Sequence, residues 1–415
     1  MVIAGAGLAG ATAALTLRRL GFDGPVTLVG EESRPPYHRP PLSKTYLRGE
    51  EQLDTVFVAA AEEYARQGVE LRTSTRVARL DARLKQVELD AGTGRPYERL
   101  SYDRLLVATG SRNARLPVAG VDLDGILQLR TLDESERLRA EARPGRRAVV
   151  VGMGFIGCEV AASLRQLGVE VAAVLPRRMP LERVLGPRVG AVLADVHRGH
   201  GVDLVAEDAV AAFEGDGRVE RVRTKGGRTL ECDFAVVGVG VIPNAELLEL
   251  AGAAVANGVL VDPRCRTTLP DVYAAGDVAN HWHPLFGRAR VEHWNNAFQQ
   301  GEAAARSVLD EGEDYDYLHS FWSEQYEHKI EYLGLAERWD DVVLRGAPAS
   351  REFLAFYLRD GAVRAAFGLD RGGDPEDPAD DGELKACAPL IRDGVPVDSA
   401  RLADESVGLA SLHSC

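Results

Sequence analysis

The sequence has few cysteines and no arrangement of them that suggests a metal or dithiol site. The five cysteines are widely spread: Cys158, Cys232, Cys265, Cys387 and Cys415. None belongs to a C-x-x-C pair or to a Cys/His cluster with zinc or iron-sulfur spacing. His281 and His283 stand one residue apart, but without a third ligand such a pair usually belongs to an ordinary loop. We therefore expect reduced thiols, a cytoplasmic location and no bound metal.

Long apolar runs and a basic surplus are also missing. No stretch approaches the roughly 20 apolar residues that span a bilayer. The net charge of -14 argues against a nucleic-acid partner, because phosphate backbones require a basic face. No signal peptide precedes the first strand, and the sequence contains neither G-x-S-x-G nor a Walker-A motif. The length of 415 residues predicts two or three domains.

Glycine is abundant, and three of the 43 glycines form the motif around which the chain is organised. A buried strand is predicted at 2–4, and Gly5, Gly7 and Gly10 then give the spacing G-x-G-x-x-G before a helix that reaches Leu20. The first glycine permits a tight turn, the second lets a pyrophosphate approach the backbone, and the third lets helix and strand pack closely. The helix N-terminus then holds the phosphates.

An acidic residue follows at the distance that a dinucleotide site requires. A second strand at 25–29 leads to Glu31, roughly 20 residues past the last glycine, where an acid binds the ribose hydroxyls. An ordinary strand-turn-helix remains the alternative, but the whole pattern favours a dinucleotide. The first strand is short for the centre of a sheet, so native N-terminal residues are expected to be missing from this numbering.

The same pattern occurs a second time. A buried strand leads into Gly152, Gly154 and Gly157, again spaced G-x-G-x-x-G, and a helix at 158–167 and a strand at 169–174 follow. Two matches, each with flanking strand and helix, are unlikely to arise by chance. The duplication therefore predicts two bound dinucleotides.

The remaining elements complete the predicted fold. They are an extended proline-rich loop at 33–44, a helix at 50–67, strands at 69–73, 77–80, 86–89, 105–110, 234–240 and 271–274, a domain crossing at 117–125, and a helix at 291–309 that starts near His293. Together they predict an α/β fold with two Rossmann-like, glutathione-reductase-like dinucleotide-binding domains and a C-terminal α+β domain. The first domain comprises 1–112 and 241–316, the second 113–240 and the third 317–415.

Six further segments make the chain similar to a known family. They are Arg39-Pro-Pro-Leu-Ser-Lys44, Ala108-Thr-Gly110, Leu129-Arg-Thr-Leu132, Ala274-Ala-Gly-Asp-Val278, Glu292-His-Trp-Asn-Asn296 and Phe321-Trp-Ser323. On these segments the chain resembles the FAD-dependent NAD(P)H:ferredoxin reductases that serve Rieske oxygenases and bacterial haem-thiolate monooxygenases, the putidaredoxin-reductase-like family to which apoptosis-inducing factor is related. The resemblance covers essentially the whole chain.

The resemblance implies which residues bind the two dinucleotides. The ADP half of FAD lies against the first glycine motif, Glu31 and Arg39, and Asp277 accepts hydrogen bonds from the ribityl chain. The implied FAD set is Gly5, Gly7, Leu8, Ala9, Gly10, Glu31, Arg39, Lys44, Val77, Ala108, Thr109, Gly110, Arg130, Asp277, Val278, Glu292, His293, Trp294 and Trp322. The implied coenzyme set is Gly152, Gly154, Phe155, Ile156, Gly157, Glu159, Arg177, Arg178 and Gly240.

Three of these residues are implied to be catalytic. In the family Lys44 sits near the flavin N5 atom and pairs with Glu159, while Trp294 lies against the isoalloxazine. Trp322 closes the site from the C-terminal domain. The helix that begins near His293 could direct its positive end at the charge that a reduced flavin gains. Without the resemblance, Lys44 would be interpreted as a surface lysine after a proline-rich loop.

The implied function is electron transfer from NAD(P)H through FAD to a small iron-sulfur ferredoxin, by a monomer or weak dimer that binds neither nucleic acid nor membrane. One alternative is an FAD-dependent NAD(P)H oxidase or another pyridine-nucleotide-disulfide-type oxidoreductase, although no cysteine follows the first acidic loop. A second alternative is a non-catalytic redox-sensing interaction protein. Docking an acidic ferredoxin to an acidic protein requires a local basic patch, for which Arg288 and Arg290 are weak candidates.

The choice between NADH and NADPH depends on the strand after the second glycine motif. In NADH-using members this strand ends in an acid that repels the 2′-phosphate of NADPH. Leu175 stands at that position, and Arg177 and Arg178 follow, with guanidinium groups that suit a phosphate. We expect NADPH or dual use; the alternative is a preference for NADH with both arginines as ordinary surface residues.

Overall fold

The computed structural model describes the chain except residues 93, 95, 96, 378, 381 and 413–415, so Cys415 lies outside the described residues. The chain divides into two compact units. Unit 1 comprises Met1–His38, Gln52–Arg112 and Val241–Tyr317, and unit 2 comprises Arg39–Glu51, Asn113–Gly240 and Leu318–Cys415. The chain passes between the units after residues 38, 51, 112, 240 and 317. Residues 39–51 and the expected C-terminal domain belong to unit 2.

Unit 1 contains a parallel sheet of five strands in the order β19-β7-β1-β2-β3. The strands are β1 (Val2–Ala4), β2 (Val26–Val29), β3 (Val69–Arg72), β7 (Leu105–Val107) and β19 (Val272–Ala274). All the residues of β1, β2, β7 and β19 are buried, as expected for parallel strands covered on both faces. The carboxyl end of β1 therefore opens the first glycine turn at the middle of this sheet.

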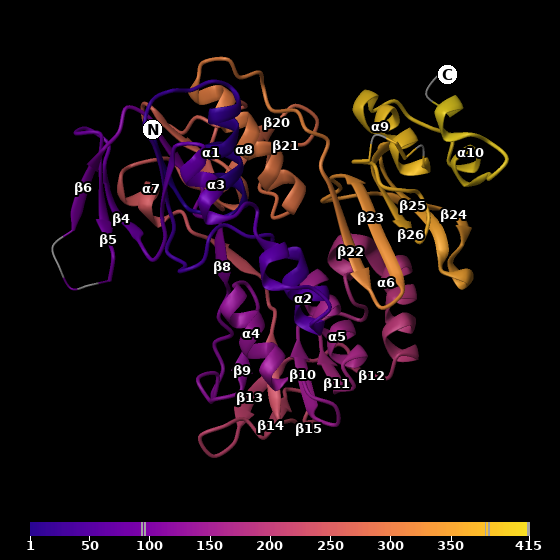
Figure 1. Cartoon of the computed structure of the whole chain (residues 1–415). Helices are drawn as coiled ribbons and strands as arrows, with labels where there is room; N and C mark the ends of the chain where they lie inside the picture. Colours follow the sequence, from indigo (N-terminus) through magenta and orange to yellow (C-terminus); the bar gives the residue numbers. More distant parts are fainter. Residues whose placement is uncertain (93, 95–96, 378, 381, 413–415) are drawn as a thin grey trace. The chain divides into compact units, whose positions relative to one another are not determined.

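The two faces of this sheet pack against different layers (Figure 1). Helices α1 (Leu8–Arg19) and α8 (Trp294–Val308) cover one face, where Ile3 joins the core with alanines of both helices. Val2 and Ala4 point to the opposite face and pack with Leu89 of β5 (Gln86–Asp90). Burying a side chain such as Ile3 contributes about 1.5–3 kcal/mol. Small residues on α1 let the two helices approach closely enough to share this core.

The remaining elements of unit 1 lie around this sheet. They are η2 (Leu53–Val56), α3 (Ala61–Arg66), β4 (Arg76–Asp81), β6 (Glu98–Ser101), β8 (Ser111–Asn113), which runs across the boundary, β17 (Val241–Pro243), α7 (Glu246–Leu250), β18 (Val259–Leu260), η3 (Gly276–Val278), β20 (Ala279–His283) and β21 (Gly287–Ala289). The expected antiparallel pair at 77–80 and 86–89 is confirmed as β4 and β5, and β6 adds a third strand to it.

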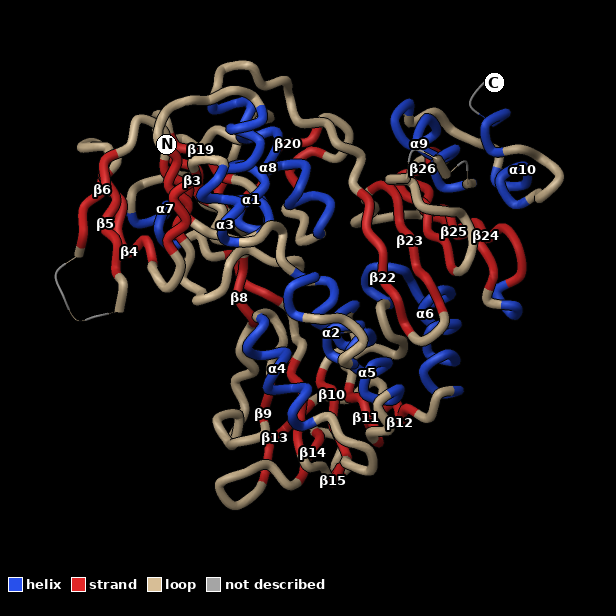
Figure 2. Tube along the Cα trace, in the orientation of Figure 1, coloured by secondary structure: helices blue, strands red, loops and turns tan. Residues whose placement is uncertain are grey.

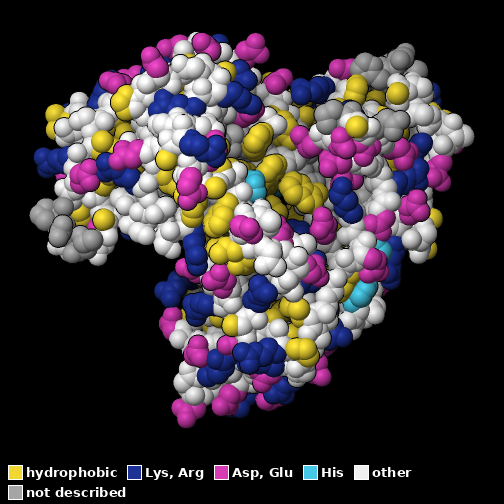
Figure 3. All heavy atoms as spheres, viewed as in Figure 1, with side chains coloured by type: hydrophobic (Ala, Val, Ile, Leu, Met, Phe, Trp, Pro, Cys, Tyr) yellow, Lys and Arg dark blue, Asp and Glu magenta, His cyan; other side chains and the backbone are white. Residues whose placement is uncertain are grey.

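Unit 2 begins with a second parallel sheet, in the order β12-β11-β10-β16-β9. Its strands are β10 (Arg147–Val151), β11 (Glu170–Val174), β12 (Val202–Val205), β16 (Phe234–Val237) and β9 (Ile126–Leu127), and a small antiparallel sheet of β13 (Val210–Glu214), β14 (Arg221–Thr224) and β15 (Thr229–Glu231) joins its core. Lys and Arg (dark blue) alternate with Asp and Glu (magenta) over the end that holds β13, β14 and β15 (Figure 3). Ion pairs such as Arg223 with Glu214 account for this mixture.

The helices of the same part of unit 2 precede or connect these strands. They are η1 (Pro40–Ser43), α2 (Thr45–Arg48), α4 (Leu132–Glu141), α5 (Phe155–Gln166) and α6 (Glu182–Gly199). The last of them bends at Gly186, whose φ is +74°, immediately before Pro187. Repetition of strand, glycine turn and helix in both units confirms the predicted pair of Rossmann-like folds.

The C-terminal part of unit 2 is an antiparallel sheet in the order β22-β23-β26-β25-β24, with a helix against it (Figure 2). The elements are β22 (Ser320–Gln325), β23 (His328–Gly334), β24 (Asp341–Ala347), η4 (Pro348–Ser350), β25 (Glu352–Arg359), β26 (Ala362–Leu369), α9 (Glu383–Asp393), α10 (Ser399–Ala403) and η5 (Leu409–Leu412). Antiparallel strands followed by helices confirm the expected α+β arrangement.

Two local predictions were wrong. The helix expected at 50–67 is interrupted, because Phe57 pairs with Tyr37 and the Val58 amide donates to the Pro36 carbonyl, which draws this segment into an extended conformation. The loop expected at 33–44 ends in the 3-10 helix η1, since proline is tolerated in a first helical turn. Among the described residues, no helix is long and apolar enough to cross a bilayer.

Candidate functional site

The first glycine turn has the geometry of a phosphate cradle. The φ of Gly5 is +116°, and a Cβ there would lie 2.2 Å from the Ala108 carbonyl oxygen. A Cβ on Gly10 would lie 2.0 Å from the Gly5 carbonyl oxygen, so helix and strand meet backbone to backbone. Gly7 differs, because a Cβ there would have no described heavy atom within 4 Å. Gly7 also caps α1 without a side-chain hydrogen bond, so its open side suits a pyrophosphate.

Unit 2 repeats this arrangement at the second glycine turn. Gly152 has φ +93° and a Cβ there would lie 2.3 Å from the Gly238 carbonyl oxygen, while one on Gly157 would lie 2.0 Å from that of Gly152. Gly154, the N-cap of α5, again faces open space. Beside this turn, Ile156 is exposed. The two units therefore hold two equivalent cradles, which fit two dinucleotides.

A buried carboxylate directly follows Gly276, where a Cβ would lie 3.0 Å from the Ala9 side chain of α1. Asp277 is buried on η3, and its Oδ2 accepts a hydrogen bond of 2.7 Å from Ser111 Oγ. Ser111 directly follows the predicted segment at 108–110. Thr109 Oγ1 donates to the Asn244 carbonyl at 2.8 Å, and Asn244 Nδ2 donates to the Thr109 carbonyl at 2.9 Å, so these two bonds hold the segment. Ser111 and Asn244 were not predicted from the sequence, since a serine or an asparagine carries no local signal for its distant partner.

The start of α8 places two aromatic residues in the same unit. His293 is the N-cap, as predicted, and burial lowers its pKa to about 4, with Asp277 opposing the shift. Trp294 donates from Nε1 to His38 Nδ1 at 3.0 Å and stacks on Phe298 at 5.6 Å between ring centroids. These bonds hold the indole in a single orientation. The burial of the other predicted residues of unit 1 varies. Val278 on η3 is buried and Val77 on β4 is half-buried, whereas Glu31, which follows β2, and Glu292 are exposed.

Unit 2 contains the expected ion pair of Lys44 and Glu159. The lysine Nζ lies 3.0 Å from Glu159 Oε2, and the two side chains are 7% and 4% exposed. Ser43 Oγ also donates to Oε2 at 2.5 Å, and Ser323 Oγ donates to Oε1 at 2.7 Å. The carboxylate thus has three donors, which is the arrangement that a buried charge requires. Neither serine was among the predicted site residues.

Three other predicted residues of unit 2 lie beside η1, beside α4 and on β22. Arg39 precedes η1 and donates to the Arg130 carbonyl, while Arg130 precedes the capping box of α4. Trp322 is half-buried on β22, and its neighbour Phe321 packs edge-on against Phe155 at 4.7 Å. Gly240 has φ +110° and open space at its Cβ position.

No acidic residue directly follows β11, where Leu175 stands. Leu175 is buried and its amide donates to the Val205 carbonyl at 3.0 Å. Arg177 and Arg178 are exposed, and Arg178 Nε lies 4.0 Å from Glu207 Oε2. Exposed pairs at this distance contribute little energy, so the guanidinium stays available to an anion.

The described cysteines do not fit dithiol chemistry. All four, Cys158, Cys232, Cys265 and Cys387, are free and buried. Burial raises the pKa of the Cys158 thiol far above its usual range, and the same cause raises that of Cys232 to about 12. A thiol that stays protonated is a poor nucleophile. Among the described residues, no group of three His, Cys, Asp or Glu could hold a metal ion.

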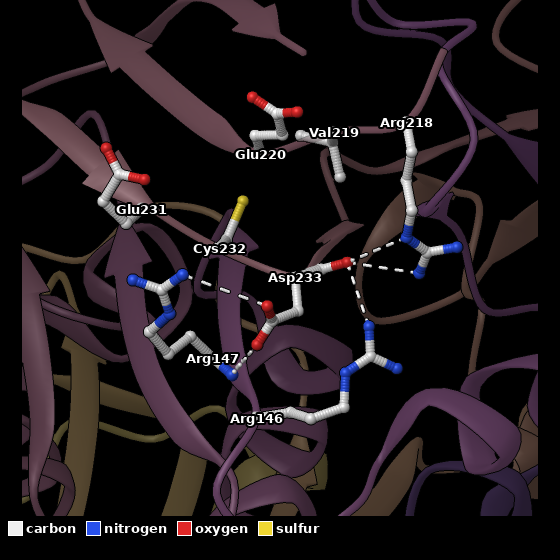
Figure 4. Close-up of a pocket in the computed structure, with 8 residues that line it drawn as sticks. All are labelled: Arg146, Arg147, Arg218, Val219, Glu220, Glu231, Cys232 and Asp233. Atoms are coloured by element: carbon white, nitrogen blue, oxygen red, sulfur yellow. Dashed lines mark hydrogen bonds and ion pairs between the residues drawn. The ribbon is translucent and has the colours of Figure 1, made fainter. Parts of the chain in front are cut away.

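A surface hollow of about 350 Å³ in unit 2 is separate from these residues (Figure 4). It is lined by Arg146, Arg147, Arg218, Val219, Glu220, Glu231, Cys232 and Asp233. Asp233 bonds to all three arginines: its Oδ1 lies 3.9 Å from the Arg147 guanidinium, and its backbone carbonyl accepts hydrogen bonds from Arg146 and Arg218. None of the predicted site residues lines this hollow.

Comparison with known proteins agrees with this geometry. Residues 1–301 match the model of the pyridine nucleotide-disulphide oxidoreductase family, and residues 320–413 match that of the reductase C-terminal family. The chain is 38% identical to the 5,5'-dehydrodivanillate O-demethylase ferredoxin reductase subunit of Sphingobium sp., over 99% of this chain and 97% of that protein. It is 36% identical to the biphenyl dioxygenase system ferredoxin--NAD(+) reductase component of Paraburkholderia xenovorans, over 99% and 98%.

A solved structure shows the same fold over the whole chain. The reductase in the covalent putidaredoxin reductase-putidaredoxin complex matches with a TM-score of 0.93 and 34% identity, covering 100% of this chain and 97% of that one. An NAD-dependent persulfide reductase from A. fulgidus, at 22% identity and a TM-score of 0.87, shares the fold alone.

Proposed function

The chain belongs to the pyridine nucleotide-disulphide oxidoreductase family and carries a reductase C-terminal domain, and from that premise we propose that it is an FAD-dependent NAD(P)H:ferredoxin reductase. Its electrons pass to a small iron-sulfur ferredoxin that serves a haem-thiolate monooxygenase or Rieske oxygenase. This proposal rests on the two phosphate cradles together with similarity, over 99% of the chain, to ferredoxin reductases of oxygenase systems.

The residues of unit 1 fit the adenine-nucleotide and ribityl parts of FAD. The open side of Gly7 accepts a pyrophosphate, Glu31 lies at the end of β2 where it can take ribose hydroxyls, and the buried Asp277 is an acceptor for further hydroxyl groups. Ser111 orients that carboxylate through its hydrogen bond. When bound, FAD supplies the chemistry, because a flavin takes a hydride and passes electrons on singly.

We propose that Lys44, Glu159 and Trp294 support this transfer at the flavin, as the family resemblance implies. The ion pair keeps a fixed ammonium charge in an almost dry environment, which makes its field stronger than it would be in water. The hydrogen bond from Trp294 to His38 fixes the orientation of the indole plane. These residues orient and stabilise charge and donate no electrons themselves.

We propose NADPH or dual use for the coenzyme. Leu175 cannot repel a 2′-phosphate, and the exposed Arg177 and Arg178 can form charge-assisted hydrogen bonds with one. The reductase is proposed to act as a monomer or weak dimer.

The proposal is tested on the purified protein. It is expected to be yellow, with one non-covalent FAD per chain, and to support reduction of cytochrome c by NAD(P)H only when a ferredoxin is added. A colourless protein that FAD cannot reconstitute would refute the proposal. Ferredoxin-independent hydrogen peroxide production at the full rate would favour an oxidase instead.

A further inference from the structure

A continuous series of hydrogen bonds leads away from the Lys44-Glu159 pair through unit 2. Ser323 Oγ donates to Glu159 Oε1 at 2.7 Å, and Gln325 Nε2 lies 3.3 Å from that serine oxygen. Gln325 Oε1 is 3.1 Å from His197 Nε2, and His197 Nδ1 is 3.1 Å from the Tyr326 hydroxyl. Ser323, Gln325 and His197 are each no more than 1% exposed. A buried polar series of this length is stabilising only when each group has its partner.

The hydrogen bond that Ser323 donates to Glu159 determines where the protons in this series lie. Ser323 has one hydroxyl hydrogen and donates it to Glu159, so its oxygen must accept from the amide nitrogen of Gln325. The amide oxygen of Gln325 then faces His197 Nε2, which must carry a hydrogen. In a neutral ring the other nitrogen, Nδ1, is an acceptor, and it receives the Tyr326 hydroxyl hydrogen. All four donors therefore point towards Glu159.

Burial keeps His197 in the neutral form that this order requires. Removal from water lowers the pKa of His197 to about 4, an effect that the hydrogen bond to Gln325 opposes and the nearby His200 reinforces. The ring lies on α6, whereas its partners Gln325 and Tyr326 lie on and just after β22. The imidazole thus links the dinucleotide-binding part of unit 2 to its C-terminal sheet.

The far end of the series holds a backbone conformation that its residue disfavours. Tyr326 has φ +61° in the two-residue turn between β22 and β23, a region that favours glycine and is rare for bulky side chains. Its ring stacks on His200, with centroids 3.6 Å apart and planes 10° apart. His200 is held in turn by the Val196 carbonyl at 2.8 Å and by Glu327 at 3.1 Å. These contacts compensate for a conformation that a glycine would adopt freely.

We propose that Ser323, Gln325, His197 and Tyr326 are positioning residues that orient hydrogen-bond donors towards Glu159 and so keep its carboxylate ionised and paired with Lys44. The described groups that face this carboxylate are Ser43 and Lys44 from the η1–α2 segment and Ser323 from β22. Only Ser323 connects it to the rest of the series. The kinetic consequence rests on the proposed function, because it requires the ion pair to act in flavin reduction.

The proton order is tested without reference to activity. In the FAD-loaded protein with ¹⁵N-labelled histidine, the His197 signals, identified by their loss in His197→Gln, are expected to show the Nε2-H tautomer. They should not titrate between about pH 6 and 8. Tyr326→Phe removes the donor to Nδ1 and should change the Nδ1 shift, whereas its ring can still stack. An Nδ1-H tautomer, or an imidazolium at neutral pH, would overturn the proposal.

The kinetic test compares three serine variants of β22. Ser323→Ala removes a hydrogen-bond donor from the Glu159 carboxylate, so the acidic limb of the flavin-reduction rate plotted against pH should move to higher pH. Ser323→Thr keeps the hydroxyl group, so its rate of flavin reduction should depend on pH as that of the wild type does. Ser320→Ala is the matched control, because Ser320 is equally buried on the same strand and donates to Glu376.

The outcomes separate this inference from the proposed function. If Lys44→Met leaves the rate of flavin reduction unchanged, the proposed role of the ion pair fails, while the tautomer test of the series still stands. If Lys44→Met slows reduction but Ser323→Ala gives the profile of Ser320→Ala, the ion pair acts alone and the positioning role is refuted.

Discussion

The Lys44 ammonium lies 3.0 Å from the Glu159 carboxylate, and both side chains are almost completely removed from water. Residues 115 positions apart in the chain thus form a buried ion pair between the η1–α2 segment and the N-terminal half of α5. Such a pair costs desolvation energy and is weak evidence for stability. We therefore propose that the pair serves as a fixed charge in the reaction rather than as a source of stability.

The first prediction concerns this pair. Lys44→Met and Glu159→Gln each leave a buried group without its partner and should each destabilise the protein by about 3–5 kcal/mol, whereas the double variant should lose less than the sum. All three should slow flavin reduction in stopped-flow measurements. Lys85→Met breaks an exposed pair with Asp271 and should cost less than about 1 kcal/mol with no change in rate. Additive losses would show that the two residues do not interact.

The second prediction separates the folding and binding roles of two neighbouring glycines. Gly10→Ala places a methyl group 2.0 Å from a backbone oxygen, so the variant should fail to fold or unfold at a much lower temperature. Gly7→Ala meets only open space in the protein, so it should fold normally but retain little FAD. Thermal unfolding of the apoprotein and the flavin content of the purified protein provide the two measurements. Normal FAD content in Gly7→Ala would contradict the phosphate cradle.

The glycine turns were predictable because their signal is local. A tight turn, an open approach and a close packing contact each require glycine, and the three positions lie within six residues of one another. Ser111, by contrast, bonds to Asp277 across 166 positions, and Ser323 reaches Glu159 across 164. A serine carries no sign of its distant partner, so these residues could not be found from the sequence. The helix expected at 50–67 was wrong for a related reason, since the pairing of Phe57 with Tyr37 is tertiary.

The third prediction concerns the coenzyme. Arg177→Glu/Arg178→Glu reverses two exposed charges beside Leu175, which provides no acid of its own. The variant should lose kcat/KM for NADPH by about tenfold or more, with a much smaller change for NADH, because a charge-assisted hydrogen bond contributes about 1.5–3 kcal/mol. Glu207→Gln is the matched control, because it removes the carboxylate that lies 4.0 Å from Arg178 and leaves both arginines in place. This variant should not lose kcat/KM for NADPH. A strong wild-type preference for NADH that the charge reversal leaves unchanged would show that these arginines do not bind the coenzyme.

The fourth prediction is a loss of stability in mild acid. Burial lowers the pKa of His197 and His293 to about 4 and that of His281 to about 3. In the unfolded chain these rings bind protons near pH 6.5. The unfolded state therefore binds more protons below that pH, and the free energy of unfolding should fall as pH drops from about 6.5 to about 4, by up to about 1.4 kcal/mol per pH unit for each ring. In urea unfolding across this pH range, the free energy of unfolding of His281→Gln should fall less steeply with pH than that of the wild type. An unchanged dependence would contradict a lowered pKa for His281.

Electron transfer from the coenzyme through FAD to a ferredoxin is tested most directly by anaerobic stopped-flow mixing of the FAD-loaded protein, NADPH or NADH, and the iron-sulfur ferredoxin of an oxygenase system. We expect that the flavin absorbance falls first and that the ferredoxin is then reduced at a rate that rises with its concentration and saturates. Omission of either the coenzyme or FAD should abolish both phases. A flavin that is reduced rapidly while the ferredoxin stays oxidised at every concentration, with hydrogen peroxide forming once air is admitted, would contradict a role as a ferredoxin reductase.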